Sequence, residues 1–211
     1  MSLDEKRRPA PNVRGLPGFY DDLSASLGHA WAMLSRGAAD RRAAFHTPVV
    51  ATVDETGGPS QRVMVLRAAD PDLRRLRLHT DLRSDKLRHL ARNPRMALNF
   101  YDAGAKLQLR VSGSGRVHAG DAVWQAAWAG AKPQSRLCYE QMEAPGSKIA
   151  APLPELPVDK WYALADAGAA NFAVLVVSVD AVEWLYLAIE GHRRARWTWN
   201  DGAWEGTWLA P

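Results

Sequence analysis

The chain has 211 residues and a mass of 23.2 kDa, and it is 47% hydrophobic and 24% charged. This composition is that of a globular domain and excludes disordered, collagen-like and coiled-coil chains. The longest apolar run, Phe172–Val177, is far shorter than the ~20 residues of a membrane-spanning helix. No apolar core of a signal peptide follows the basic N-terminus, and the single cysteine, Cys138, excludes an internal disulfide. We therefore expect a cytoplasmic protein without a membrane partner.

The isoelectric point is about 9.4, and the excess positive charge is concentrated in one segment. Between Arg62 and Arg95 there are ten Lys or Arg and four Asp, a net charge of +6 against +4 for the whole chain. Such a segment attracts an anion, either a phosphate ester or a nucleic-acid backbone. Because only the isoelectric point supports a nucleic-acid-binding protein, we expect a small-molecule partner and no nucleic acid.

The predicted elements begin after residues 1–18, which lack periodicity and predict a mobile arm, and residues 19–211 are expected to form one domain. Apolar residues at helical spacing predict a helix over 19–37. Further helices are expected over 85–92, 121–129 and 159–167, with a proline-rich covering loop over 132–157. Alternating apolar and polar residues predict strands over 49–53, 61–68, 73–80, 95–102, 106–118, 172–179, 182–187, 194–199 and 204–209.

Many short strands with single helices between them do not form a repeating βαβ pattern. They favour a mainly β fold of the α+β class, an antiparallel barrel with peripheral helices. The chain has no dinucleotide fingerprint, phosphate loop, nucleophile elbow or His-Glu-x-x-His motif. The six histidines are scattered, so we assign no metal site and no catalytic residue.

One group of residues suits a phosphate. Arg62 and Arg67 bracket an apolar strand, Thr80 ends the next strand, and Ser84 and Lys86 open a helix. A helix N-terminus, a hydroxyl and fixed cations together bind phosphate well. The alternative is that these are solvated charges on a strand and a helix.

The order and spacing of these pieces favour the phosphate site. The segments Arg62-Val-Met-Val-Leu-Arg67, Leu78-His-Thr80, Ser84-Asp-Lys86, Asn93-Pro-Arg-Met-Ala-Leu98 and Leu107-Gln-Leu-Arg-Val-Ser-Gly113 together resemble the pyridoxamine 5'-phosphate oxidase family. The end of the chain, from Arg193-Arg-Ala-Arg-Trp197 to Pro211, is similar to that family's C-terminal segment. The resemblance covers roughly residues 40–118 and 180–211.

The resemblance implies an antiparallel split β-barrel that binds FMN at the interface of a homodimer. Arg62 and Lys86 would face the FMN phosphate, and Gln108 and Arg196 would reach the flavin from the partner subunit. The flavin-binding residues implied are Arg62, Val63, Met64, Val65, Leu66, Arg67, His79, Thr80, Ser84, Lys86, Gln108 and Arg196. The expected function is an FMN-dependent oxidoreductase; the alternative is a flavin- or haem-binding barrel without oxidase activity.

Departures from the family's pattern bear on the substrate, whose expected contacts are Arg67, Trp128 and Arg193. Asp85 replaces one phosphate-binding cation of the family, with Arg83 as a candidate substitute. Trp128 falls near the residues that hold the substrate phosphate in the family, and the family's C-terminal histidine is missing. We therefore expect weak or no oxidation of pyridoxamine 5'-phosphate and a larger or more apolar flat substrate. Of the nine tryptophans, most are expected in the core or at the dimer interface.

Overall fold

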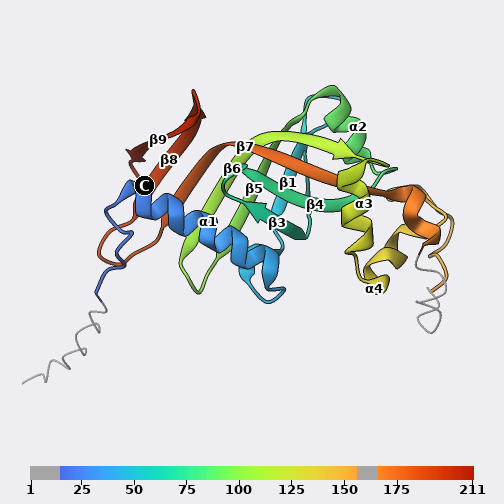
Figure 1. The fold of residues 1–211 in the computed structure, drawn as a ribbon, viewed down its shortest axis with the longest axis horizontal. Coiled ribbons are helices and arrows are strands. Elements are labelled where there is room, and N and C mark those ends of the chain that lie inside the picture. The colour runs from blue at the N-terminus through green and yellow to red at the C-terminus, as the bar shows by residue number, and fades with distance from the viewer. Residues whose placement is uncertain (1–14, 156–165) are drawn as a thin grey trace, which may run out of the picture.

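Nine antiparallel strands form one sheet in the computed structural model, which describes residues 15–155 and 166–211 (Figure 1). The strand order is β2-β1-β5-β6-β7-β4-β3, and β8 and β9 continue from β7. The sheet stays open, with β2, β3 and β9 as edges, and its mainly β architecture confirms the predicted fold class. The strands are β1 (Val49–Val53), β2 (Pro59–Val63), β3 (Leu66–Asp70), β4 (Arg75–Asp81), β5 (Arg95–Asp102), β6 (Leu107–His118), β7 (Phe172–Tyr186), β8 (Arg193–Asn200) and β9 (Ala203–Leu209).

The sequence predicted two strands, 172–179 and 182–187, where the structure has the single strand β7. The chain stays extended because both of its edges are paired. One edge of β7 pairs with β6; the other pairs first with β4 and then with β8. A register shift between Ser112 and Gly113 bends the β6–β7 pair. A Cβ at Gly113 would lie 2.2 Å from the Ser178 carbonyl oxygen, so this close approach requires glycine.

The predicted single strand 61–68 is also wrong, because the structure has two strands there, β2 and β3. The chain changes partners there: β2 pairs with β1, and β3 pairs with β4. Met64 and Val65 connect the two strands and belong to neither. Arg67 lies in a register shift between Leu66 and Ala68, a bulge of the kind that redirects side chains near binding sites.

Within the described residues, four α-helices lie at the periphery of the sheet. Helix α1 (Leu23–Ala39) begins at Asp22, whose carboxylate accepts the Ala25 N–H, and it buries Trp31 and Leu34. Helices α2 (Asp85–Arg92) and α3 (Ala122–Ala129) form where the sequence predicts them. The predicted loop 132–157 begins instead with α4 (Pro133–Arg136) and the 3-10 helix η2 (Leu137–Tyr139). Two further 3-10 helices are η1 (Ala44–His46) and η4 (Ala167–Asn171).

The predicted arm over 1–18 and the predicted helix over 159–167 fall largely outside the described residues. Within the described ranges, no helix has the length and apolarity needed to cross a bilayer.

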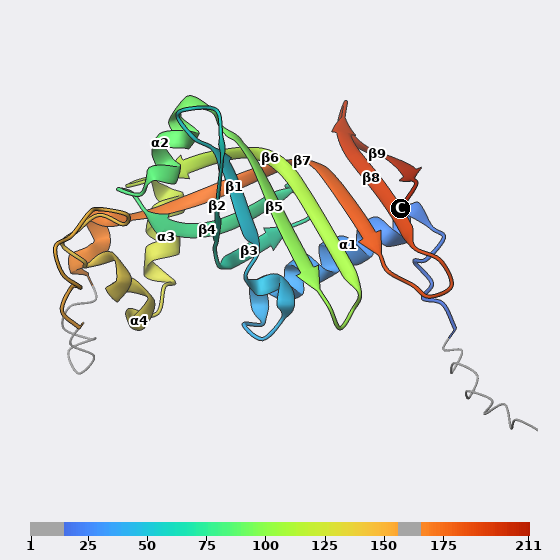
Figure 2. The same ribbon diagram turned by 180° about the vertical axis from the view of Figure 1, so that it is seen from behind.

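Two hydrophobic clusters stabilise opposite faces of the β4–β7 pair. The main core fills the inner face of the sheet and includes Leu78 and Leu175. A smaller cluster on the other face contains Trp128 of α3 together with Phe172 and Val174 of β7. Figures 1 and 2 both place α3 and α4 at one end of the molecule and the β8–β9 hairpin at the other.

Candidate functional site

Arg62 is held in one orientation at the edge of the sheet. Its Nη1 donates to the Thr52 hydroxyl and to the Ser60 carbonyl, both at 2.9 Å, and its Nη2 donates to the Ser60 hydroxyl at 2.8 Å. Among the residues that the structure describes, Nε and the second hydrogen of Nη2 have no partner. The guanidinium is therefore fixed by the protein and still has donors for a ligand.

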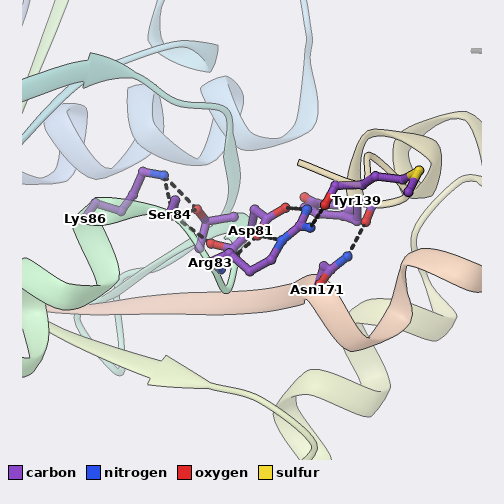
Figure 3. Close-up of polar contacts among 8 residues, drawn as sticks. Asp81, Arg83, Ser84, Lys86, Tyr139 and Asn171 are labelled. Carbon is purple, nitrogen blue, oxygen red and sulfur yellow. Dashed lines mark hydrogen bonds and ion pairs between the residues drawn. The ribbon is translucent and has the colours of Figure 1, made fainter. Parts of the chain in front are cut away.

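Lys86 lies over two buried hydroxyls. Its Nζ donates to Thr80 Oγ1 at 3.0 Å and to Ser84 Oγ at 2.8 Å. Figure 3 shows Lys86 beside Ser84. Ser84 in turn donates to the Asp81 carbonyl at 2.7 Å. Ser84 occupies the N-cap of α2 but makes no capping hydrogen bond, so the first N–H groups of the helix are open to an anion.

The charges of Arg62 and Lys86 are only partly compensated. Burial lowers the pKa of the Lys86 ammonium, and the positive charge of Arg62 lowers it further, whereas Asp81 and Asp85 act in the opposite direction. Burial also lowers the pKa of Arg62. Two neighbouring, partly desolvated cations favour a bound dianion, which would stabilise both. We call Arg62, Thr80, Ser84 and Lys86 the phosphate cluster.

Arg83 does not join the phosphate cluster, contrary to the expectation that it substitutes for the family's missing cation. Its guanidinium donates to both carboxylate oxygens of Asp81, at 3.0 and 2.8 Å, and to the Met142 carbonyl at 3.0 Å. In Figure 3 it points toward Tyr139 and away from Lys86. Asp81 is 7% exposed and Arg83 is 26% exposed, so this bidentate pair is a partly buried structural contact.

A second polar region is a cavity of about 490 Å³ on the other side of β4. It lies between β3, β4, the end of α3 and the segment that connects α1 to β1. Four cations line it, and no Asp or Glu is among the described residues of its wall. The ionisable residues of the wall are Arg41, His46, Arg67, Arg77, His79 and Lys132.

Several side-chain nitrogens in this cavity are buried and unpaired within the described structure. They are Nε of Arg67, Nε of Arg77 and Nε2 of His79. Burial lowers the pKa of His79 to about 4, and the charges of Arg67 and Arg77 contribute to the same shift. His79 is therefore neutral at pH 7, and the positive charge of the cavity comes from its Arg and Lys side chains.

The segment Val63–Leu66 runs between the phosphate cluster and the cavity. Arg62 precedes it and Arg67 follows it. Thr80 and His79 lie opposite Ala173 and Val174 of β7, so these adjacent β4 residues face opposite sides of the strand. Thr80 thus belongs to the phosphate cluster, whereas His79, predicted among the flavin contacts, lines the cavity instead.

Gln108 and Arg196 lie on the outer face of the sheet. Gln108 Nε2 donates to Asn99 Oδ1 at 2.9 Å, and Arg196 lies opposite Glu183 on β7. The inner face of these strands holds buried residues such as Val111. Within one chain, the structure therefore does not bring Gln108 or Arg196 to the phosphate cluster.

Two residues expected to contact substrate are engaged elsewhere. Trp128 is 8% exposed, stacks on Trp124 and donates its indole N–H to Asp166 at 3.3 Å; it does not line the cavity. Arg193 pairs with Asp21 at 2.7 Å and lies over the Tyr20 ring. Of the three predicted substrate contacts, only Arg67 faces the cavity.

The sequence analysis missed the residues that support Arg62, namely Thr52 and Ser60, and the cavity residue Arg77. The alternation of inward and outward residues along a strand could have identified Thr52 and Arg77. Thr52 follows Val50 by two positions and so shares its inward face, where a polar residue needs a partner. Arg77 lies between the inward residues Leu76 and Leu78 and was therefore an outward cation.

Comparisons with known proteins identify the family of this chain. A family model described as pyridoxamine 5'-phosphate oxidase matches residues 37–184. A pyridoxine/pyridoxamine 5'-phosphate oxidase of Burkholderia mallei (strain SAVP1) is 43% identical over 68 residues, which is 32% of this chain and 31% of that relative. The matched segment thus spans about a third of the curated relatives' length.

Solved structures show the same fold. One is a pyridoxamine 5'-phosphate oxidase-related, FMN binding protein from Nostoc punctiforme, with a TM-score of 0.69 and 22% identity over 93% of this chain and 100% of that one. Another is PhzG from Burkholderia lata, solved with tetrahydrophenazine-1-carboxylic acid, with a TM-score of 0.67 and 19% identity over 94% and 98% of the two chains. The present chain belongs to the pyridoxamine 5'-phosphate oxidase family and has its split-barrel fold, with an open sheet.

Proposed function

We propose that this protein is an FMN-dependent oxidoreductase that acts as a homodimer on a small, negatively charged substrate. The observation that carries the proposal is the phosphate cluster. Arg62 and Lys86 are fixed, partly buried cations with free donors, and Thr80 and Ser84 add hydroxyls. A phosphate monoester supplies the dianion and the acceptor oxygens that this set requires.

The segment Val63–Leu66 would hold the flavin ring between the phosphate cluster and the cavity. Bound flavin supplies the hydride-accepting chemistry, and the protein supplies orientation and charge. Arg67 lies at the end of this segment, where its positive charge favours negative charge that develops on the ring. The cavity beyond it would receive the substrate.

The charge of the cavity changes the expected substrate class. The sequence favoured a flat, apolar molecule because aromatic residues replaced the family's phosphate contacts. Arg41, Arg77 and Lys132 instead converge with Arg67 from separate parts of the chain. Unpaired cations in a cavity favour an anionic ligand. A carboxylic acid, the class of ligand seen with PhzG, and a phosphate ester both meet this requirement.

A second copy of the chain would complete the flavin site. Gln108 and Arg196 face outward from the sheet and do not reach the phosphate cluster of their own chain. We propose that they contact the flavin bound by the partner subunit. The outer face also carries the exposed side chains of Val63 and Tyr101, which a dimer interface would bury.

Loss of either cation of the phosphate cluster should weaken FMN binding. Arg62→Ala and Lys86→Ala are each expected to lower the affinity about ten- to hundred-fold, since a hydrogen bond to a charged group contributes about 1.5–3 kcal/mol. Titration of the apoprotein with FMN, followed by flavin fluorescence, measures this. Arg92→Ala, on the exposed last turn of α2, is the matched control. Full FMN occupancy in the Arg62→Ala, Lys86→Ala double variant would contradict the site.

Mixing defective subunits tests the dimer. We expect neither Arg62→Ala nor Arg196→Ala protein to bind FMN well. Because the two residues would come from different subunits, each mixed dimer should contain one intact site and one doubly defective site. Co-refolding equal amounts of the two variants should therefore restore about a quarter of all sites. Sedimentation should give twice the chain mass of 23.2 kDa. No recovery on mixing, or a flavin-loaded monomer, would rule out the shared site.

Pyridoxamine 5'-phosphate should bind but turn over slowly. The cavity cations can hold its phosphate, whereas the family's C-terminal histidine is absent and Arg193 is paired with Asp21. With saturating FMN, we expect kcat/KM below ~10⁴ M⁻¹s⁻¹, the lower end of typical enzymes. Arg77→Met should weaken binding of this compound more than that of pyridoxamine, which lacks the phosphate. Turnover in the usual enzymatic range would show that the departures from the family pattern are without consequence.

The low pKa of His79 should make stability depend on pH. Between about pH 6.5 and 4 the unfolded chain protonates this histidine and the folded chain does not, so the free energy of unfolding falls as the pH decreases. The expected loss is about 2–3 kcal/mol, from the size of the pKa shift. Urea unfolding in phosphate-free buffer measures it, and His79→Phe should remove this part of the dependence. A constant difference between the two proteins from pH 4 to 7 would contradict this explanation.

A further inference from the structure

A buried hydroxyl–imidazole pair lies directly behind Arg62. Thr52 Oγ1 is 3.0 Å from His89 Nδ1, and the two residues are 2% and 7% exposed. Thr52 belongs to β1 and His89 to α2, so the contact joins the strand beside Arg62 to the helix that carries Lys86. Neither residue is part of the phosphate cluster.

One direction in this arrangement follows from the donors around it. Arg62 can only donate, so Thr52 Oγ1 accepts its Nη1–H at 2.9 Å. The Thr52 hydroxyl can also bond His89 Nδ1, either as the donor to a ring with its hydrogen on Nε2 or as the acceptor from Nδ1–H. The resulting chain runs from Arg62 through Thr52 to His89.

We propose that Thr52 and His89 are positioning residues for the flavin phosphate, an inference that rests on the proposed function. Through Thr52, His89 fixes the Arg62 guanidinium. Through its own helix, it fixes the distance from that guanidinium to Lys86, three residues earlier on α2. The two cations are thereby arranged before the ligand arrives, which reduces the cost of binding.

Packing alone does not account for the pair. A buried hydroxyl and imidazole are costly unless each is hydrogen-bonded, and apolar residues of the same size fill such space without that requirement. The polar pair does what an apolar pair cannot: it supplies an acceptor for one Arg62 N–H. Without it, the long side chain of Arg62 retains only its contacts with the Val50 and Ser60 carbonyls and the Ser60 hydroxyl.

Removal of the Thr52 hydroxyl tests the proposal, with riboflavin as the phosphate-free probe. In wild-type protein, FMN should bind much more tightly than riboflavin. Thr52→Val, which has the same shape, should weaken FMN binding about ten-fold and leave riboflavin binding unchanged. Thr52→Ser restores the hydroxyl and should bind FMN like wild type. His89→Leu should reproduce the FMN loss, whereas His89→Gln, whose amide oxygen can accept from Thr52, should not.

A double-mutant cycle separates positioning from general damage. In the Arg62→Ala background, Thr52→Val should cause no further loss of FMN affinity, because the residue that it positions is absent. Equal loss of FMN and riboflavin binding, or the full loss of FMN affinity in the Arg62→Ala background, would overturn the inference. If Thr52→Val does not fold, the same comparison of His89→Leu with His89→Gln decides the matter. Wild-type protein that binds FMN no better than riboflavin would overturn the proposed function itself.

Discussion

The fifteen residues of β7 are hydrogen-bonded along both edges, and this double pairing sets the arrangement of the site. One edge meets β6; the other meets β4 in its first half and β8 in its second. Because β4 and β8 pair with different parts of the same edge of β7, the sheet divides between these two strands. The β4 half carries the phosphate cluster and the cavity, and the β8 half extends to the opposite end of the molecule (Figure 2). The phosphate cluster and Arg196 thus lie on different parts of the sheet, and a single chain does not bring them together.

The pairing of cations distinguishes structural from functional charge in this molecule. Arg83, Arg136 and Arg194 each form ion pairs with a carboxylate of the chain, at 2.7–2.8 Å. The phosphate cluster and the cavity are different, because their cations contact hydroxyls and carbonyls or have buried nitrogens without a partner in the described structure. Burial of charge without an internal counter-ion is costly, and a bound anion is the simplest compensation. The proposed anion site therefore rests on contacts within this chain as well as on its relatives.

Successive residues of β4 face opposite sides of the strand, so β4 contributes side chains to both polar regions. Thr80 faces Lys86 on the inner side, and its neighbour His79 faces the cavity. The segment Val63–Leu66 passes between these regions at the point where the chain changes from one pairing partner to the other. A flat ligand lying along that segment would contact the phosphate cluster at one end and the cavity at the other. The break between β2 and β3 thus leaves this segment outside both strand pairings, as the proposed site requires.

Local signals determined a large part of this protein. Alternation predicted most strands, and capping and periodicity predicted α2, because each depends on near neighbours in the chain. The phosphate site of Arg62, Thr80, Ser84 and Lys86 was expected from a resemblance to a known family, and it stays a prediction. The long strand β7 and the break after Val63 were decided by pairing with distant strands, which local patterns do not encode. Side-chain contacts were also decided by the tertiary structure. Arg83 pairs with Asp81 and donates to the Met142 carbonyl, and Trp128 packs in the smaller hydrophobic cluster. Only the tertiary structure could bring Arg77 to Arg67, or Thr52 to His89, because charge and hydrogen-bond pairing depend on distance in space rather than on separation in sequence.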